Sequence, residues 1–150
     1  MSVLLDTNIL LRLIEPSDPE YAVVRDAVKT LTMRGESLYF SPQNLVEFWN
    51  VCTRSAARNG LGLTPEETNR RALLIEHQFR LVPDNERVYQ EWRRLVVVHA
   101  VSGVQVHDAR IAAIMLTHGI GALLTLNGRD FARFTGVSII HPREVVLSGL

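Results

Sequence analysis

Four acidic side chains in this sequence occur singly among predominantly apolar residues: Asp6, Glu47, Asp108 and Asp130. Carboxylates that crowd together repel one another unless a cation neutralises them. Oxygen ligands without an accompanying set of Cys or His favour Mg²⁺ or Mn²⁺ over zinc. If the chain brings the four acids together, we therefore expect a metal site suited to phosphoryl-transfer chemistry, because such ions keep bound waters and bind phosphate oxygens.

Each acid also has a simpler structural explanation. Asp6 follows an apolar run and precedes a helical pattern, so it could serve only as a helix cap. The same holds for Asp108 and Asp130 near their own helix starts. Glu47 has no basic residue within four positions, so no salt bridge along its helix explains it, yet a lone Glu can point to solvent. Taken one at a time, the acids leave both interpretations open.

The elements that position these acids alternate between strand and helix patterns. Short apolar runs predict strands at residues 3–5, 38–40, 122–126 and 137–140, and a short extended segment at 81–83. Helical spacing and cap-then-proline pairs predict helices that start near residues 9, 19, 42, 65, 86 and 104. Short strands separated by helices predict a mainly parallel central sheet covered on both faces, a three-layer α/β/α sandwich.

In a sheet of this kind, ligands bind at the carboxyl ends of the strands. Asp6 and Asp130 each follow a predicted strand, and Asp108 opens a helix that leads into one. Glu47 lies in a helix, residues 42–52, that is apolar nearly all round and that we expect to be largely buried. The topology therefore predicts that three acids gather at one edge of the sheet and that Glu47 projects inward to meet them.

Composition indicates an ordinary folded protein. The chain has 150 residues, 47% of them hydrophobic and 21% charged, which predicts one domain spanning residues 1–150. No apolar run approaches the roughly 20 residues of a membrane span, and we find no pattern of a secretory signal. Cys52, the single cysteine, cannot form an internal disulfide and is expected to pack in the core. We expect a cytoplasmic protein with no membrane partner.

The formal charge is zero, from sixteen basic and sixteen acidic residues, which argues against a broadly basic surface for nucleic acid. If four acids bind cations, however, the remaining surface has an excess of four positive charges. Fifteen of the sixteen basic residues are Arg, which suits bidentate phosphate contacts, although codon bias could give the same ratio.

The ordered set of motifs resembles the PIN domain family, and most closely the VapC-type ribonuclease toxins of prokaryotic toxin–antitoxin pairs. The matching segments are Val-Leu-Leu-Asp-Thr-Asn at residues 3–8, Leu-Val-Glu-Phe at 45–48, His-Asp-Ala-x-Ile-Ala at 107–112 and Thr-Leu-Asn-Gly-Arg-Asp-Phe at 125–131. The resemblance extends over essentially the whole chain, in order. It implies that Asp6, Glu47 and Asp108 bind the metal and that Thr7 and Asn8 support the site.

The fourth metal-binding position is less clear from the resemblance. In many members an acid occupies the place of Asn127 as well as that of Asp130. With Asn127 neutral, Asp130 is the candidate for the fourth ligand. Alternatively Asp130 is chiefly a structural cap, and Asn127 holds a water or the substrate.

The resemblance further implies an Mg²⁺- or Mn²⁺-dependent endoribonuclease that hydrolyses RNA phosphodiesters and leaves a 5′-phosphate and a 3′-hydroxyl. It implies a homodimer that a small cognate antitoxin protein holds inactive. Four arginines are candidate phosphate contacts, although each one taken singly is at least as well explained as solvated surface. They are Arg54, Arg58, Arg129 and Arg133.

Two other functions fit parts of the same pattern. A phosphohydrolase of small phosphate esters would share the α/β arrangement, but aspartyl-phosphate phosphatases carry Asp-x-Asp after the first strand, whereas this chain has Asp6-Thr7-Asn8. A degenerate PIN domain could bind RNA or protein without cutting it. Asn127 favours that alternative, and the retention of the other acids opposes it.

Overall fold

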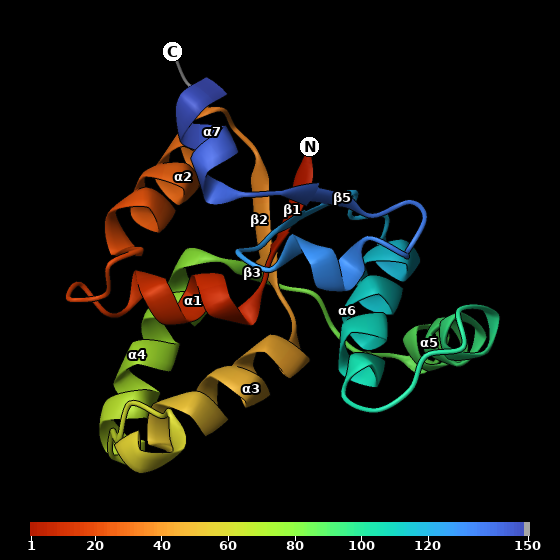
Figure 1. Ribbon diagram of the computed structural model, residues 1–150. Helices are drawn as coiled ribbons and strands as arrows, with labels where there is room; N and C mark the ends of the chain where they lie inside the picture. The colour runs from red at the N-terminus through yellow and green to blue at the C-terminus, as the bar shows by residue number, and fades with distance from the viewer. Residues whose placement is uncertain (149–150) are drawn as a thin grey trace.

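The computed structural model describes residues 1–148 of the chain (Figure 1). Its five strands are β1 (Ser2–Leu5), β2 (Ser37–Phe40), β3 (Arg80–Leu81), β4 (Ala122–Leu124) and β5 (Ser138–Ile140). They form one sheet in the order β3-β2-β1-β4-β5, and all of these pairings are parallel. The predicted parallel sheet is confirmed, with β1 at its centre.

Helices cover both faces of this sheet. They are α1 (Thr7–Leu13), α2 (Tyr21–Met33), α3 (Pro42–Thr53), α4 (Pro65–Gln78), α5 (Glu86–Val98), α6 (Gln105–His118) and α7 (Pro142–Ser148), with short 3-10 turns η1 (Ala56–Arg58) and η2 (Gly128–Phe131). Helices α5 and α6 pack together on one side, and α1, α2, α3, α4 and α7 lie on the other (Figure 1). The three-layer α/β/α sandwich is confirmed.

The central strand supplies side chains to two separate cores. Successive residues of a strand point to opposite faces, and here Val3 and Leu5 join the core under α1 and α2, whereas Leu4 joins the core under α5 and α6. All three side chains are fully buried. This burial on both faces explains why the strand is an unbroken apolar run instead of an alternating one.

Three helices start directly after a cap residue whose side chain accepts a hydrogen bond, and the start of α2 differs from its prediction. Ser41, Thr64 and Asn85 each accept a hydrogen bond at the start of α3, α4 and α5. The predicted start of α2 at residue 19 is wrong, because the Asp18 carboxylate accepts from the backbone N–H of Glu20 (2.8 Å) and forms a turn there. The helix begins at Tyr21.

Helix α3 is not the largely buried helix that its apolar sequence predicts. Its buried side chains are Gln43, Asn44, Phe48 and Cys52, so two of the four are polar. Val46 is 70% exposed. The polar residues face the carboxyl edge of the sheet, and apolar residues take their place on the solvent side.

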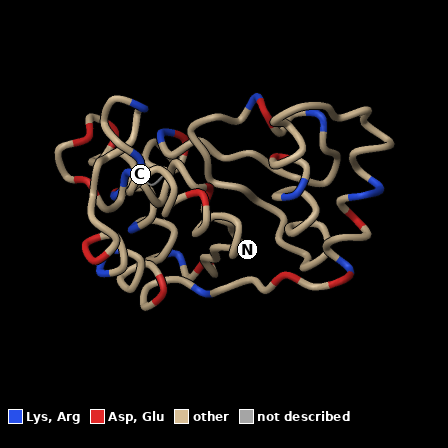
Figure 2. Tube along the Cα trace, turned by 90° about the horizontal axis from the view of Figure 1, so that it is seen from below, with Lys and Arg blue, Asp and Glu red and all other residues tan. Residues whose placement is uncertain are grey.

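Charged residues of both signs are interleaved along the whole chain, as Figure 2 shows. Several arginines are paired with a neighbouring acid, as in Arg25–Asp26 and Arg94–Glu91. Among residues 1–148, no helix has the length and apolar character needed to cross a membrane.

Candidate functional site

The carboxyl ends of the parallel strands meet at one edge of the sheet, and the first turns of α1, α3 and α6 come together there (Figure 1). Asp6 follows β1, Glu47 lies in the second turn of α3, Asp108 lies in the first turn of α6, and Asp130 lies in η2 after β4. The charges of the other three acids all raise the pKa of Asp108, so the four predicted acids are neighbours.

Asp6 both caps α1 and belongs to this cluster. Its Oδ1 accepts a hydrogen bond from the Thr7 backbone N–H (2.8 Å), which confirms the cap. Its Oδ2 accepts from the Thr125 hydroxyl (2.7 Å) and from Asn8 Nδ2 (3.4 Å). Since Asp6 is only 8% exposed, these donors hold a nearly buried carboxylate in one orientation.

Asn8 and Thr125 join the start of α1 to the segment that follows β4. Asn8 Nδ2 donates to Thr125 Oγ1 (3.2 Å), and Asn8 Oδ1 accepts from the Leu126 backbone N–H (3.2 Å). The Asn127 backbone N–H also donates to Thr125 Oγ1 (3.0 Å). Sequence reasoning missed Thr125, although a hydroxyl within a buried apolar run is the kind of residue that could have revealed it.

Glu47 points inward, not to solvent. Its Oε2 accepts from the Thr7 hydroxyl (2.7 Å), and its Oε1 accepts from Gln43 Nε2 (2.8 Å). The Thr7 oxygen in turn accepts from Asn44 Nδ2 (3.2 Å). Thr7 therefore links two of the acids, because its backbone N–H binds Asp6 and its hydroxyl binds Glu47.

Gln43 is a second residue that sequence reasoning missed. It lies one helical turn before Glu47, on the same side of α3, and its Nε2 also donates to the backbone oxygen of His107 (3.0 Å). Its Oε1 accepts from Arg110 (2.9 Å), which donates as well to Asp84 (2.8 Å). Gln43 thus connects Glu47 on α3 to the first turn of α6.

Asp108 is not the cap of α6. Val104 is the N-cap residue and makes no side-chain cap bond, and Asp108 lies one turn further along. Its pKa is raised from 3.8 to about 6, first by burial. The negative charges of Asp130, Asp6 and Glu47 add to this rise.

Asp6 shows the same electrostatic pattern. Burial raises its pKa most, and the charges of Glu47 and Asp130 raise it further, against the lowering effect of the hydrogen bonds from Thr125 and Thr7. Two carboxyls in the cluster thus carry charge at a cost. A bound cation would stabilise the charged form of these carboxyls and so offset the effect of burial and of the neighbouring acids.

The donor set fits a hard divalent cation. All four side chains offer carboxylate oxygen, the ligand that Mg²⁺ and Mn²⁺ prefer. A carboxylate has about four acceptor positions, and the hydrogen bonds above leave part of this capacity free on Asp6 and Glu47. Within residues 1–148, no three His, Cys, Asp or Glu side chains are grouped closely enough to hold an ion as they stand. Side-chain rotation is therefore required before three of them share one ion.

Asp130 and Asn127 lie on the more open side of the cluster, since both are exposed. Asn127 is the N-cap of η2, and no side-chain hydrogen bond caps that turn. The charge of Asp130 acts on both Asp6 and Asp108. Asp130 therefore lies near these acids, and its role as the fourth metal ligand stays a prediction.

The four candidate arginines fall into two groups. Arg129 and Arg133 are exposed and flank Asp130, although Arg133 also donates to Gln105 Oε1. Arg54 and Arg58 lie beyond the opposite end of α3, about 10 Å or more along the helix from Glu47. Arg54 donates to the backbone oxygen of Asn59 (3.1 Å) and so helps to shape its own loop.

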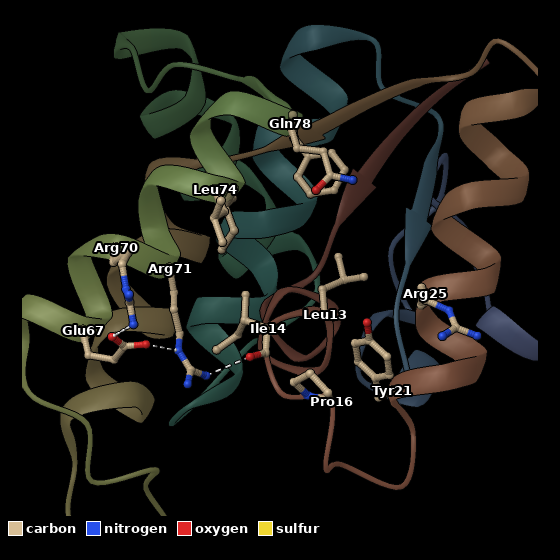
Figure 3. Close-up of a pocket in the computed structure, with 12 residues that line it drawn as sticks. Leu13, Ile14, Pro16, Tyr21, Arg25, Glu67, Arg70, Arg71, Leu74 and Gln78 are labelled. Carbon is tan, nitrogen blue, oxygen red and sulfur yellow. Dashed lines mark hydrogen bonds and ion pairs between the residues drawn. The ribbon is translucent and has the colours of Figure 1, made fainter.

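A cavity of about 600 Å³ lies away from these acids, between the end of α1, the start of α2 and α4 (Figure 3). Apolar side chains such as Leu13, Ile14 and Leu74 form much of its lining. The arginines at its rim are already paired: Arg70 and Arg71 both bind Glu67. The cavity therefore does not contribute charged groups to the acid cluster.

The PIN domain model matches residues 3–137, so the chain belongs to the PIN domain family. No curated protein sequence matches it. Among solved structures, 33 chains match.

Three of these structures illustrate the likeness. VapBC2 from Rickettsia felis, bound to a DNA fragment from its promoter, has a TM-score of 0.71 at 16% identity and covers 94% of this chain and 98% of its own. VapBC from Salmonella typhimurium bound to DNA has a TM-score of 0.69 at 20% identity. The match covers 95% of this chain and 98% of that one. VapC20 from Mycobacterium tuberculosis, a toxin that cleaves the sarcin–ricin loop, has a TM-score of 0.65 at 18% identity. The match covers 90% of this chain and 98% of that one. At these identities the likeness establishes a shared fold.

Proposed function

We propose that this chain is a divalent-metal-dependent endoribonuclease of the VapC type, neutralised by a cognate antitoxin. The observation that carries the proposal is the grouping of Asp6, Glu47, Asp108 and Asp130 at the carboxyl edge of the sheet in a PIN domain. RNA is the proposed substrate because VapC20, which shares the fold, is a toxin that cleaves the sarcin–ricin loop. An antitoxin is the proposed partner because two further structures of this fold are VapBC complexes.

The four acids would hold Mg²⁺ or Mn²⁺, which would act as a Lewis acid and activate a water. Thr7 and Gln43 donate to both oxygens of Glu47, and Thr125 donates to Asp6, so these residues would orient the two carboxylates as metal ligands. Hydrolysis would break the bond between phosphorus and the 3′ oxygen. The products would carry a 5′-phosphate and a 3′-hydroxyl.

The remaining features of the proposal concern the whole molecule. We propose one domain over residues 1–150, a homodimer and a cytoplasmic location. Arg129 and Arg133 are the stronger candidates for phosphate contacts, because they flank Asp130. Arg54 and Arg58 would contact only RNA that extends along α3.

RNA cleavage by the purified chain tests this function, with and without Mn²⁺. Asp6→Asn should abolish metal-dependent cleavage and leave the circular dichroism spectrum unchanged, because the amide keeps the size of the side chain. Asp26→Asn is the matched control, since it makes the same change on α2, where Asp26 pairs with Arg25. Equal activity in all three proteins would indicate a contaminating nuclease and contradict the proposal.

A PIN domain that binds RNA without cutting is the second candidate. The neutral Asn127 favours it. RNA binding with no cleavage under any metal condition would support this candidate. Hydrolysis of p-nitrophenyl phosphate without cleavage of RNA would instead support a small-molecule phosphohydrolase.

A further inference from the structure

A small pocket of about 170 Å³ lies between α5 and α6, separated from the acids by the Gln43–Arg110 contact. Val88, Tyr89 and Trp92 of α5 form one wall together with Asn85, the N-cap residue whose Oδ1 accepts from the Val88 backbone N–H, while Arg110 of α6 forms the other. Pockets for drug-sized ligands usually exceed about 300 Å³. This pocket accordingly suits one planar ring system.

Of the two aromatic residues in this pocket, Trp92 is held by a hydrogen bond and Tyr89 is exposed to solvent. Trp92 Nε1 donates to the backbone oxygen of Val106 (2.9 Å), which holds the indole against the first turn of α6, two residues before Asp108. The Tyr89 ring lies 6.2 Å from the Trp92 ring, at an angle of 40°. Tyr89 is 58% exposed, so it offers a supported aromatic face to solvent.

The polar side of the pocket has little net charge. Arg110 donates to Asp84 (2.8 Å) and to Gln43 (2.9 Å), so its charge is compensated and its guanidinium plane is held in place. A compensated guanidinium beside an aromatic ring favours a neutral planar group over a phosphate. Unstacked RNA bases stack on aromatic side chains or Arg guanidinium planes and are hydrogen-bonded along their edges.

We infer that the pocket formed by Tyr89, Trp92, Asn85 and Arg110 binds one unstacked base of the RNA substrate, close to the acid cluster. This subsite rests on the proposed ribonuclease function. Arg110 contacts both the pocket and Gln43, which in turn holds Glu47. A base seated there would therefore lie two hydrogen-bonded contacts away from a metal-binding acid.

Tryptophan fluorescence tests the subsite without any hydrolysis. The chain has two tryptophans, Trp49 and Trp92, so Trp49→Phe leaves Trp92 as the single reporter. In that background, with EDTA present, an unstructured oligoribonucleotide should quench Trp92 saturably. Polyphosphate of similar charge, which has no bases, should not.

Tyr89→Ala should weaken the binding by about 5- to 150-fold, the range for loss of one stacked base. Tyr89→Phe is the matched control and should bind within about twofold of the parent, because it keeps the ring. Equal binding by the Ala and Phe variants would overturn the subsite. The subsite would also be overturned if the emission of Trp92 changed with protein concentration and not with RNA. Tyr89 would then lie between two copies of the chain.

The subsite and the nuclease function fail in different ways. Base-dependent quenching without metal-dependent cleavage by any preparation would support the subsite and contradict the nuclease. Metal-dependent cleavage without any response of Trp92 to RNA would support the nuclease and contradict the subsite.

Discussion

The charge of Asp108 is costly to the folded chain, because burial and three neighbouring acids oppose it. Its pKa is about 6 when folded against an ordinary value of 3.8, so between these values the folded state binds more protons than the unfolded state. Stability from this group is therefore greatest at low pH and falls as pH rises through this window.

We expect Asp108→Asn to raise the free energy of unfolding at pH 8 by about 1–2 kcal/mol, allowing for partial solvent screening. The difference should shrink towards pH 4. Urea denaturation in EDTA at both pH values measures this. Asp26→Asn, the control, should change little, and a variant less stable than the parent at pH 8 would contradict the electrostatic account.

Gln43 is a positioning residue for Glu47. In Gln43→Leu, Glu47 loses the donor to its Oε1 and Arg110 loses an acceptor. Partners of this kind typically change metal affinity or activity by about 10- to 100-fold, so cleavage should fall by that factor while RNA binding in EDTA is retained. Gln90→Leu, an exposed change on α5, is the control. An equal effect of both variants would show that Gln43 has no special role.

Single residues also mark the limit of prediction from the sequence. The proximity of Asp6, Glu47 and Asp108 could be predicted because acids in apolar surroundings are unusual. Gln43 could not be predicted as their support, since its partner Arg110 is 67 positions away and no local pattern indicates their contact. Long-range hydrogen bonds are decided by packing, which a single sequence does not reveal.

At the level of elements, the start of α3 is stabilised by a reciprocal cap. The Ser41 hydroxyl accepts from the Asn44 backbone N–H, and Asn44 Oδ1 accepts from the Ser41 backbone N–H (2.9 Å). Asn44 also donates to Thr7 and is fully buried. Asn44 therefore joins α3 to α1.

Asn44→Ala should destabilise the chain by about 1–3 kcal/mol, because it removes the side-chain half of the reciprocal cap and leaves the buried Ser41 N–H without its acceptor. Thr64→Ala is the comparison: Thr64 caps α4 on an exposed surface, and its loss should cost about 1 kcal/mol. Urea denaturation gives both values. A smaller cost at residue 44 than at residue 64 would contradict the role assigned to Asn44.

Elements themselves were largely predictable, and the errors have physical causes. Caps at Ser41, Thr64 and Asn85 mark helix starts, because their side chains satisfy free N–H groups. Asp18 followed by Pro19 has the same sequence pattern, but its carboxylate closes a turn instead. The exposure of α3 was unpredictable because apolar residues such as Val46 lie on its solvent side.

At the level of the whole molecule, Cys52 lies within the core between the sheet and α4. It is fully buried, and burial raises its pKa to about 11. A thiol reagent at pH 8 should therefore leave Cys52 unmodified in the native protein and modify it in urea. Ser55→Cys places a second thiol on an exposed residue and should react at once. Rapid modification of Cys52 in the native protein would indicate local opening of α3.

The position of β1 at the centre of the sheet has a consequence for biosynthesis. Its Asp6 is oriented by Thr125, which lies 119 positions later in the chain. A ribosome adds about 5–20 residues per second, so this partner is made on the order of ten seconds after the aspartate. During that interval the nascent chain carries its first acid but lacks the threonine, directly after β4, that orients it. The proposed ribonuclease activity would therefore be assembled only near the end of translation, and unfinished copies would lack it.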